Sequence, residues 1–382
     1  MVRDWITLMK AVAFLGIWAG FADASETGRF ATAGEVGGDT IATEVDSQIA
    51  RYFLENYLQG KRTNPRFDAR IDSILQEAAR RTLTNESLKA IAERTSPDFG
   101  AMLFAHLQTQ RNLEIKQAFL REYGLAKQGR IDLRYAAERY KIVLVPGLFH
   151  RSKPETKGDL REVKATLAAE GIEVVSVPIL DAGTVEQNAR IIADFIKNEP
   201  VTHKQLILVS TSKGGPETLY ALGHLISTAD GEKIALWFSI GGALRGSFLA
   251  DRWTRWPSRW LVAVIGLFKG FSTDMVASLS DAASKQRMEQ IHISPQIGVV
   301  HFVGVPLSGT VIDEVRESYK ALLPYGPNDG ITLLPDELLD GETVITALGL
   351  DHWYRDPDLR RKILGLLVAV TRDRPRRPTP IP

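Results

Sequence analysis

Cysteine is absent from the 382-residue sequence. Its absence excludes disulfide bonds, thiolate metal sites and a lipid-modified N-terminal cysteine, so core packing alone must hold the chain together. An excess of one charge is also missing, because 47 Lys and Arg residues against 46 Asp and Glu residues leave a net charge of +1. Nucleic acid is therefore not favoured as a partner. The histidines lack the spacing of metal ligands, and the sequence predicts neither a metal nor a cofactor.

A long apolar segment is lacking as well. Residues 1–24 combine the basic residues Arg3 and Lys10 with an apolar run over residues 11–22. This run is shorter than the ~20 residues that a membrane-spanning helix requires, and the small residues after it are typical of a signal-peptidase site. We expect residues 1–24 to be a cleaved secretory signal and the protein to be exported to a bacterial periplasm or the exterior. A membrane anchor is the alternative.

The remaining composition is that of a globular protein. With 44% hydrophobic and 24% charged residues, the chain can bury a substantial core. Residues 25–45 are rich in Gly, Ala and Thr and predict a flexible lead-in. Apolar residues at helical spacing predict a helical subdomain over residues 46–140. The basic, proline-rich residues 372–382 predict a solvated tail.

From Lys141 onward, short β-branched runs alternate with helical patterns. The runs read KIVLVP, IEVVSVP, LILVS, IALWFSI and VVHFVGV. Fully apolar strands separated by helices predict a parallel sheet with helices on both faces, in which chemistry takes place at the carboxyl ends of the strands. We therefore assign residues 141–371 to one α/β domain.

The sequence LILVSTSKGGP, residues 206–216, ends an apolar strand at a serine that two glycines closely follow. This pattern puts Ser212 on a strand-to-helix turn. Such a turn lifts a hydroxyl above the sheet and leaves the next backbone N–H free to face developing negative charge, as acyl transfer requires. A serine that only caps a helix is the alternative.

A serine nucleophile requires a base. Asp329 lies in the turn sequence GPNDG, and His352 follows the strand-like sequence TVITALG. Singly, a turn aspartate and a surface histidine are ordinary features. Together with Ser212 they follow the order Ser, Asp, His, which is the order of an α/β-hydrolase triad.

Three further residues offer alternatives. Ser210 opens an S-x-x-K pattern of the kind found in penicillin-interacting enzymes, but it lies at a strand end and no K-T-G sequence occurs, so we interpret it as coincidence. Asp181 follows the strand IEVVSVP and could replace Asp329 as the acid or line the site. Asp351 adjoins His352, and we expect a supporting or solvated role because adjacent side chains usually diverge.

From Lys141 to about Trp253 the chain resembles bacterial secreted triacylglycerol lipases and esterases of the α/β-hydrolase superfamily. The matching sequences are VPGL at residues 145–148, LD at 180–181, SKGGP at 212–216 and SIGGALRGS at 239–247. The resemblance extends through the candidate Asp and His and omits residues 46–140. It implies an α/β-hydrolase fold with an inserted helical cap, here preceded by the helical subdomain.

The resemblance also implies roles for the site residues. Ser212 would be the nucleophile, His352 the general base and acid, and Asp329 the carboxylate that orients and stabilises the imidazole. The oxyanion hole would be formed by the backbone N–H groups of Leu148 and Lys213.

The sequence departs from the family pattern at three positions near the nucleophile. Ser210 replaces the first glycine of the turn, and Pro146 replaces a histidine. Lys213 stands where the family has a neutral or weakly basic residue. Its cation could assist an oxyanion if the side chain faces the site.

A cap over about residues 248–296 is expected after the strand IALWFSI, where the resembled lipases insert lid helices. Three of the seven tryptophans gather there, followed by a short apolar run with basic residues at its borders. Aromatic and aliphatic side chains can enter an acyl boundary while cations remain with headgroups. A cap that only packs over the sheet is the alternative. The candidate substrate-binding or lid residues are Trp253, Trp256, Trp260, Leu261 and Phe268.

The sequence therefore predicts an exported serine hydrolase that cleaves small-molecule or lipid esters through an acyl-enzyme on Ser212. Contact with a membrane surface through the cap is expected. A non-catalytic hydrolase-like protein that binds lipid or an envelope partner is one alternative, because fold does not determine function. A serine acyltransferase is another.

Overall fold

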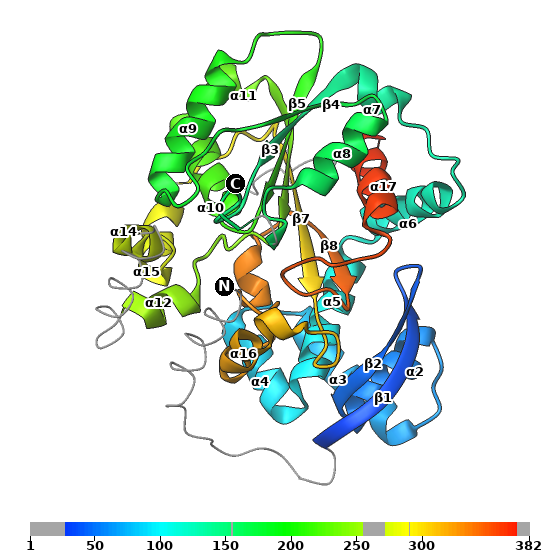
Figure 1. Ribbon diagram of the computed structural model, residues 1–382. Helices are drawn as coiled ribbons and strands as arrows, with labels where there is room; N and C mark the ends of the chain where they lie inside the picture. Colours follow the sequence, from blue (N-terminus) through cyan, green and yellow to red (C-terminus); the bar gives the residue numbers. More distant parts are fainter. Residues whose placement is uncertain (1–26, 154–155, 255–271, 290, 373–382) are drawn as a thin grey trace. The chain divides into compact units, whose positions relative to one another are not determined.

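The computed structural model describes residues 27–153, 156–254, 272–289 and 291–372 (Figure 1). The predicted signal over residues 1–24, the predicted tail beyond residue 372, and the cap residues Trp256, Trp260, Leu261 and Phe268 lie outside these ranges. Within them, no helix is long and apolar enough to cross a membrane.

The chain divides into two compact units. The first comprises the described residues of Met1–Arg111, Val303–Pro335 and Thr346–Arg355, and the second those of Asn112–Phe302, Asp336–Ile345 and Asp356–Pro382. The helical subdomain predicted over residues 46–140 is thus divided after Arg111. Its last helices belong to the second unit, because helix α6 (Leu113–Lys127) packs along the C-terminal helix α17 (Leu359–Arg372).

The first unit begins with a β-hairpin. Strands β1 (Thr27–Val36) and β2 (Asp39–Ser47) pair antiparallel. Gly37 and Gly38 join them with φ angles of 65° and 82°. A two-residue hairpin turn of type I′ needs positive φ at both central positions, and glycine adopts it without strain. The flexible lead-in predicted over residues 25–45 is therefore wrong from residue 27 onward, because the glycines form a turn between β-branched strands.

Helices follow the hairpin, as the apolar spacing predicts. The hydroxyl of Ser47 accepts a hydrogen bond from Ala50 N at the start of α2, and Gly60, with φ of 73°, ends the short helix η1. The helices of the first unit are α2 (Gln48–Glu55), η1 (Tyr57–Gln59), α3 (Pro65–Ala79), α4 (Asn85–Arg94), α5 (Pro97–Arg111), α16 (Asp313–Leu322) and η4 (Leu323–Tyr325).

Two carboxyl groups join the hairpin to α5. The backbone N–H of Asp46 donates to Asp98 Oδ2 at 2.8 Å, and that of Asp98 donates to Asp46 Oδ2 at 3.1 Å. Ser308 donates to Asp98 from its backbone N–H at 2.8 Å and from its hydroxyl at 2.6 Å. Burial, together with the charge of Asp46, raises the pKa of Asp98 to about 8. At neutral pH this buried carboxyl therefore tends to hold a proton.

The predicted sheet is present, with the strand order β4-β3-β5-β6-β7-β8. Neighbouring strands from β4 to β7 pair parallel. Every predicted apolar run falls on one of these strands, since strands covered on both faces carry apolar residues on both sides. The strands are β3 (Tyr140–Val145), β4 (Glu173–Ser176), β5 (Gln205–Thr211), β6 (Ile234–Ile240), β7 (Gly298–Val305) and β8 (Thr343–Leu348).

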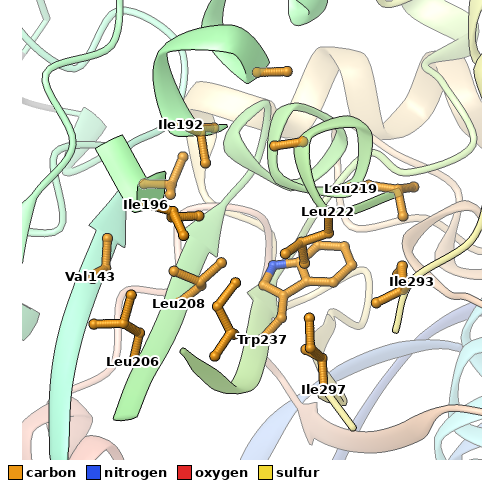
Figure 2. Packing of buried hydrophobic residues seen from close by; sticks show 14 of the residues in the cluster. Val143, Ile192, Ile196, Leu206, Leu208, Leu219, Leu222, Trp237, Ile293 and Ile297 are labelled. Carbon is orange, nitrogen blue, oxygen red and sulfur yellow. The ribbon is translucent and has the colours of Figure 1, made fainter. Parts of the chain in front are cut away.

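The core of the second unit surrounds the fully buried side chain of Trp237 on β6. Figure 2 shows its indole among Leu219, Leu222, Ile293 and Ile297. Helices α9 (Val185–Asn198) and α10 (Gly214–Tyr220) pack against each other beside it. The other helices along the chain are α7 (Arg134–Arg139), α8 (Arg161–Ala169), η3 (Ala221–Leu225), α11 (Thr228–Gly231), α12 (Phe248–Thr254), α14 (Thr273–Ala277), α15 (Asp281–Met288) and η5 (Leu334–Glu337).

Candidate active site

Ser212 lies on the turn between β5 and α10, as the sequence predicts. Its φ of 51° is left-handed, a conformation that few residues other than glycine adopt. The turn is anchored by a hydrogen bond of 3.0 Å from Ser212 N to Ile240 O at the end of the neighbouring strand β6. A serine on a strained strand-to-helix turn is the geometry of a nucleophile elbow.

The two glycines after Ser212 are required by close backbone contacts. A Cβ on Gly214 would lie 2.6 Å from Pro146 O, and a Cβ on Gly215 would lie 2.8 Å from the Cα of Gly242. Both contacts are with backbone atoms, which cannot rotate away. The turn is therefore wedged between the end of β3 and the segment that follows β6.

Ser210 has a structural use that explains the missing glycine. Its side chain is buried, and its hydroxyl accepts a hydrogen bond of 2.8 Å from Trp237 Nε1. A buried indole N–H needs an acceptor, and glycine at this position would offer none. Serine in place of the expected glycine thus provides a hydrogen-bond acceptor for the buried Trp237.

The side chain of Lys213 forms a buried ion pair with Glu217. It is buried, and its ammonium group donates to Glu217 Oε1, one turn further along α10. Burial raises the pKa of the Glu217 carboxyl to about 7, against the opposing effect of the Lys213 charge. A cation committed to a buried carboxylate has little charge left to offer an oxyanion.

The backbone N–H groups of Leu148 and Lys213 are the expected oxyanion donors. Within the described residues, neither donates to a protein acceptor. The segment before Leu148 passes beside the nucleophile, since a Cβ on Gly147 would lie 3.3 Å from the Cβ of Ser212. Both N–H groups are therefore available near the turn.

Asp181 holds the segment that follows Leu148. Its backbone oxygen accepts from Phe149 N at 3.0 Å, and its carboxylate accepts from Arg151 N at 2.8 Å and Ser152 N at 3.1 Å. Burial acts to raise the pKa of Asp181, but these hydrogen bonds outweigh burial and lower it. Its carboxylate thus supports the loop that carries one proposed oxyanion donor.

Asp329 and His352 meet within the first unit. His352 Nδ1 donates to Asp329 Oδ2, while Asp329 Oδ1 accepts from Ile331 N at 2.8 Å and Thr332 N at 2.7 Å. The backbone N–H of His352 also donates to the backbone oxygen of Asp329 at 2.9 Å. The fully buried carboxylate is therefore held in one orientation against the imidazole.

The environment favours a charged imidazole. Burial alone would lower the pKa of His352, but the charge and hydrogen bond of Asp329, with a smaller effect from the charge of Asp351, raise it above 6.5. Bonding to Nδ1 leaves Nε2 as the ring nitrogen for proton exchange.

Asp351 supports the histidine loop and is not solvated. It is buried, and its carboxylate accepts from Ile312 N at 2.9 Å and Trp353 N at 3.0 Å. Tyr354 adds a further anchor, because its hydroxyl accepts from Gly304 N at 2.9 Å. Of the two roles expected for Asp351, the solvated one is therefore wrong, because the side chain is buried.

The candidate site residues belong to different units of the chain. Ser212 and both expected oxyanion donors belong to the second unit, and the Asp329–His352 pair belongs to the first. Trp253 lies on α12, within the predicted cap. In the part of the chain that the structure describes, no group of three or more histidine, aspartate or glutamate residues could hold a metal ion.

Sequence reasoning missed two polar residues behind the elbow, Glu217 and Asn188. Glu217 follows Lys213 by four positions, which is the spacing of an ion pair on one helix face and a signal that could have identified it. Asn188 donates from Nδ2 to Glu217 Oε1 at 2.8 Å from the neighbouring helix α9. No local pattern connects residues on two different helices, so nothing in the sequence marks this contact.

No protein-family model matches the chain, and no curated relative matches its sequence. Solved structures do match. A metagenomic carboxyl esterase superposes with a TM-score of 0.50 at 20% identity, over 61% of this chain and 75% of its own. The mature lipase of Bacillus licheniformis gives a TM-score of 0.47 at 22% identity, over 56% of this chain and 86% of its own. The Staphylococcus hyicus lipase gives 0.39 at 11% identity, over 60% and 92%.

The predicted fold class is confirmed by two findings. One is the central six-stranded sheet with helices around it, in the strand order given above. The other is the superposition on the metagenomic esterase. The chain has the α/β-hydrolase fold.

Proposed function

We propose that this protein is an exported serine hydrolase that cleaves carboxylic esters, lipid esters among them, through an acyl-enzyme on Ser212. The observation that carries the proposal is the left-handed Ser212 on the turn between β5 and α10. Strain at a residue other than glycine persists only where its surroundings enforce it, and such residues concentrate at active sites. The metagenomic neighbour, which is a carboxyl esterase, supports the same class of substrate.

The proposed reaction uses each residue in one role. Ser212 Oγ attacks the ester carbonyl carbon and gives its proton to His352 Nε2, which passes it to the leaving alcohol as the carbon–oxygen bond breaks. Water then attacks the acyl-enzyme and loses a proton to His352, which passes it to Ser212 Oγ as the bond from Oγ to the acyl carbon breaks and the carboxylic acid is released. The N–H groups of Leu148 and Lys213 would bind the oxyanion in both steps.

The contacts of Asp329 support its assignment as the third member of the triad. A buried carboxylate bonded to Nδ1 selects the tautomer whose Nε2 can accept a proton. Two backbone N–H groups on the other carboxylate oxygen prevent it from rotating as the imidazole becomes charged. Asp181, the alternative acid, is occupied by backbone donors of its own loop.

Export and the substrate-binding role of the cap are parts of the same proposal that depend on sequence alone. Residues 1–24 would direct secretion, since basic residues precede a short apolar run and small residues follow it. The residues named above for the lid, from Trp253 to Phe268, would meet the acyl chain or a membrane surface.

Replacing Ser212 with Ala tests the proposal. Hydrolysis of a p-nitrophenyl ester should fall by roughly 10⁴-fold or more, as when a triad member is lost, and covalent labelling by a fluorophosphonate should disappear. Ser239→Ala is a matched control, because this buried serine lies on the neighbouring strand β6 and has no proposed role. Undiminished labelling of Ser212→Ala would exclude Ser212 as the nucleophile.

The same assays separate the two alternatives. If the protein hydrolyses no ester of a panel, and if Ser212→Ala leaves its binding to lipid vesicles unchanged, a lipid-binding protein is favoured. Transfer of the acyl group to an added alcohol in place of water would favour an acyltransferase.

A further inference from the structure

A buried ion pair lies directly behind the proposed nucleophile. Lys213 is the N-cap residue of α10 and Glu217 lies one turn further along, and their side chains are 3% and 0% exposed. Removing two charges from water costs several kcal/mol per ion, and the attraction between them often fails to repay that cost. Apolar side chains of similar volume would serve stability equally well, so the pair calls for an explanation other than stability.

Asn188 connects this pair to a second segment of the chain. Its Nδ2 donates to Glu217 Oε1 at 2.8 Å and to Leu180 O at 3.0 Å, and its Oδ1 accepts from Leu180 N at 2.9 Å. The amide is almost completely buried, and its donors and acceptor are all used. The position of Leu180 is therefore tied to the position of Glu217.

The hydrogen bonds continue from Leu180 into the loop that carries Leu148. The next residue, Asp181, accepts from the backbone N–H of Phe149 and from those of Arg151 and Ser152. One continuous path thus runs from the Lys213 side chain through Glu217, Asn188 and the 180–181 segment to Phe149. Its two ends adjoin the two proposed oxyanion donors.

We propose that Glu217 is a positioning residue that sets the separation of the Leu148 and Lys213 N–H groups. The inference rests on the proposed function, since it concerns the oxyanion hole of that site. The two donors come from loops after β3 and β5, which share no direct backbone hydrogen bond in the described residues. Oxyanion stabilisation depends on donors that are already in place when charge develops, so a link between the two loops acts on the transition state.

Glu217→Gln tests this inference directly. It retains the size of the side chain but removes the charge that holds Lys213. Loss of one oxyanion donor costs about 10²–10³ in kcat, so a displaced donor should lower kcat by roughly 10- to 100-fold. KM should change by less than about twofold, because the ground-state ester makes little use of these donors. Labelling of Ser212 by a fluorophosphonate should slow in parallel.

Glu186→Gln is the matched control. Glu186 lies in the first turn of the neighbouring helix α9, is about one third exposed, and pairs with the buried Arg287 at 2.9 Å; within the described residues it has no hydrogen bond to either oxyanion loop. The same substitution there should leave kcat and the labelling rate unchanged. An equal loss of kcat in both variants would overturn the inference, because it would mean that breaking an ion pair without a link to the oxyanion loops has the same effect.

A double variant covers the case in which Glu217→Gln fails to fold. Lys213→Met with Glu217→Met removes both buried charges and should be as stable as the wild type or more stable. It offers no acceptor to Asn188, so the inference predicts a lower kcat at unchanged KM despite the stable fold. Wild-type kcat in this variant, or in a folded Glu217→Gln, would overturn the inference.

The labelling experiment also distinguishes this inference from the proposed function. If the wild-type protein does not react with the fluorophosphonate, the proposed function is wrong and the inference falls with it. If the wild type reacts and the variants react at the same rate, only the role of Glu217 is wrong.

Discussion

Replacing Ser210 with Ala should destabilise the protein through a single hydrogen bond. The Ser210 hydroxyl is the acceptor for Trp237 Nε1, at 2.8 Å, and both side chains are 0% exposed. The indole lies in the centre of the core shown in Figure 2, among aliphatic side chains, with the buried ring of His301 edge-on to it at 6.1 Å between centroids. Once the hydroxyl is gone, the indole N–H loses the acceptor that Ser210 provides.

The magnitude follows from the cost of a stranded donor. A neutral hydrogen bond contributes about 0.5–1.5 kcal/mol net, and a buried donor without a partner costs about 1–3 kcal/mol. We therefore expect Ser210→Ala to lower the free energy of unfolding by about 1–3 kcal/mol. With a urea dependence of ~3 kcal/mol per molar, the unfolding midpoint should fall by about 0.3–1 M.

Ser239→Ala is the control, because it makes the same change on the neighbouring strand. Ser239 lies opposite Ser210 in the register of β5 and β6, and it is equally buried. Within the described residues its hydroxyl has no hydrogen-bond partner. Removing a buried hydroxyl without a partner should leave stability unchanged or raise it.

Urea unfolding followed by far-UV circular dichroism measures both variants. The double variant Ser210→Ala with Trp237→Phe should lose less than the sum of its single variants, by about 1 kcal/mol, since donor and acceptor leave together. Equal midpoints for Ser210→Ala and Ser239→Ala would refute the reasoning. So would strict additivity in the double variant.

Two further predictions concern pH. The rate of ester hydrolysis should fall as the pH drops through a midpoint above 6.5, because Asp329 raises the pKa of His352 and only the neutral imidazole accepts a proton. Asp329→Asn should move the midpoint of the pH–rate profile to lower pH. An unmoved midpoint would contradict the pairing of Asp329 with His352. The free energy of unfolding should fall as the pH rises from 3.8 towards about 8, because folded Asp98 keeps a proton that the unfolded chain releases. Urea titrations at about pH 5 and about pH 8 measure this slope, and Asp98→Asn should flatten it. A slope equal to that of the wild type would show that Asp98 does not bind the proton.

Much of the fold could be predicted because its signals are local. Five of the six strands of the sheet fall on the predicted apolar runs, β8 falls on the strand-like sequence TVITALG, and the elbow at Ser212 combines a strand end with two glycines. The hairpin over residues 27–47 was missed although its signal is also local. The glycine pair at residues 37–38 has the spacing of a hairpin turn, but the composition of the segment favours a linker.

The division into units could not be predicted in the same way. Helix α6 follows α5 directly in the chain, and both carry apolar residues at helical spacing. The partner of α6 is α17, more than two hundred residues later. A Cβ on Gly365 of α17 would lie 2.9 Å from Tyr123 N, so this glycine permits the close packing. Periodicity shows that a helix has a buried face, but it does not show which element covers that face.

The sequence by itself determined the strand pattern, the serine turn and the chain order of Ser212, Asp329 and His352. These depend on spacing along the chain, which the printed residues contain. Only the tertiary structure decided what the side chains around the elbow do. In the folded protein, Lys213 donates to Glu217, and the Ser210 hydroxyl accepts from the Trp237 indole. One carboxylate oxygen of Asp329 accepts from two backbone N–H groups, and the other accepts from His352. Most of these contacts depend on where the folded backbone brings groups together, and the direction of a side chain is set by the partner it meets.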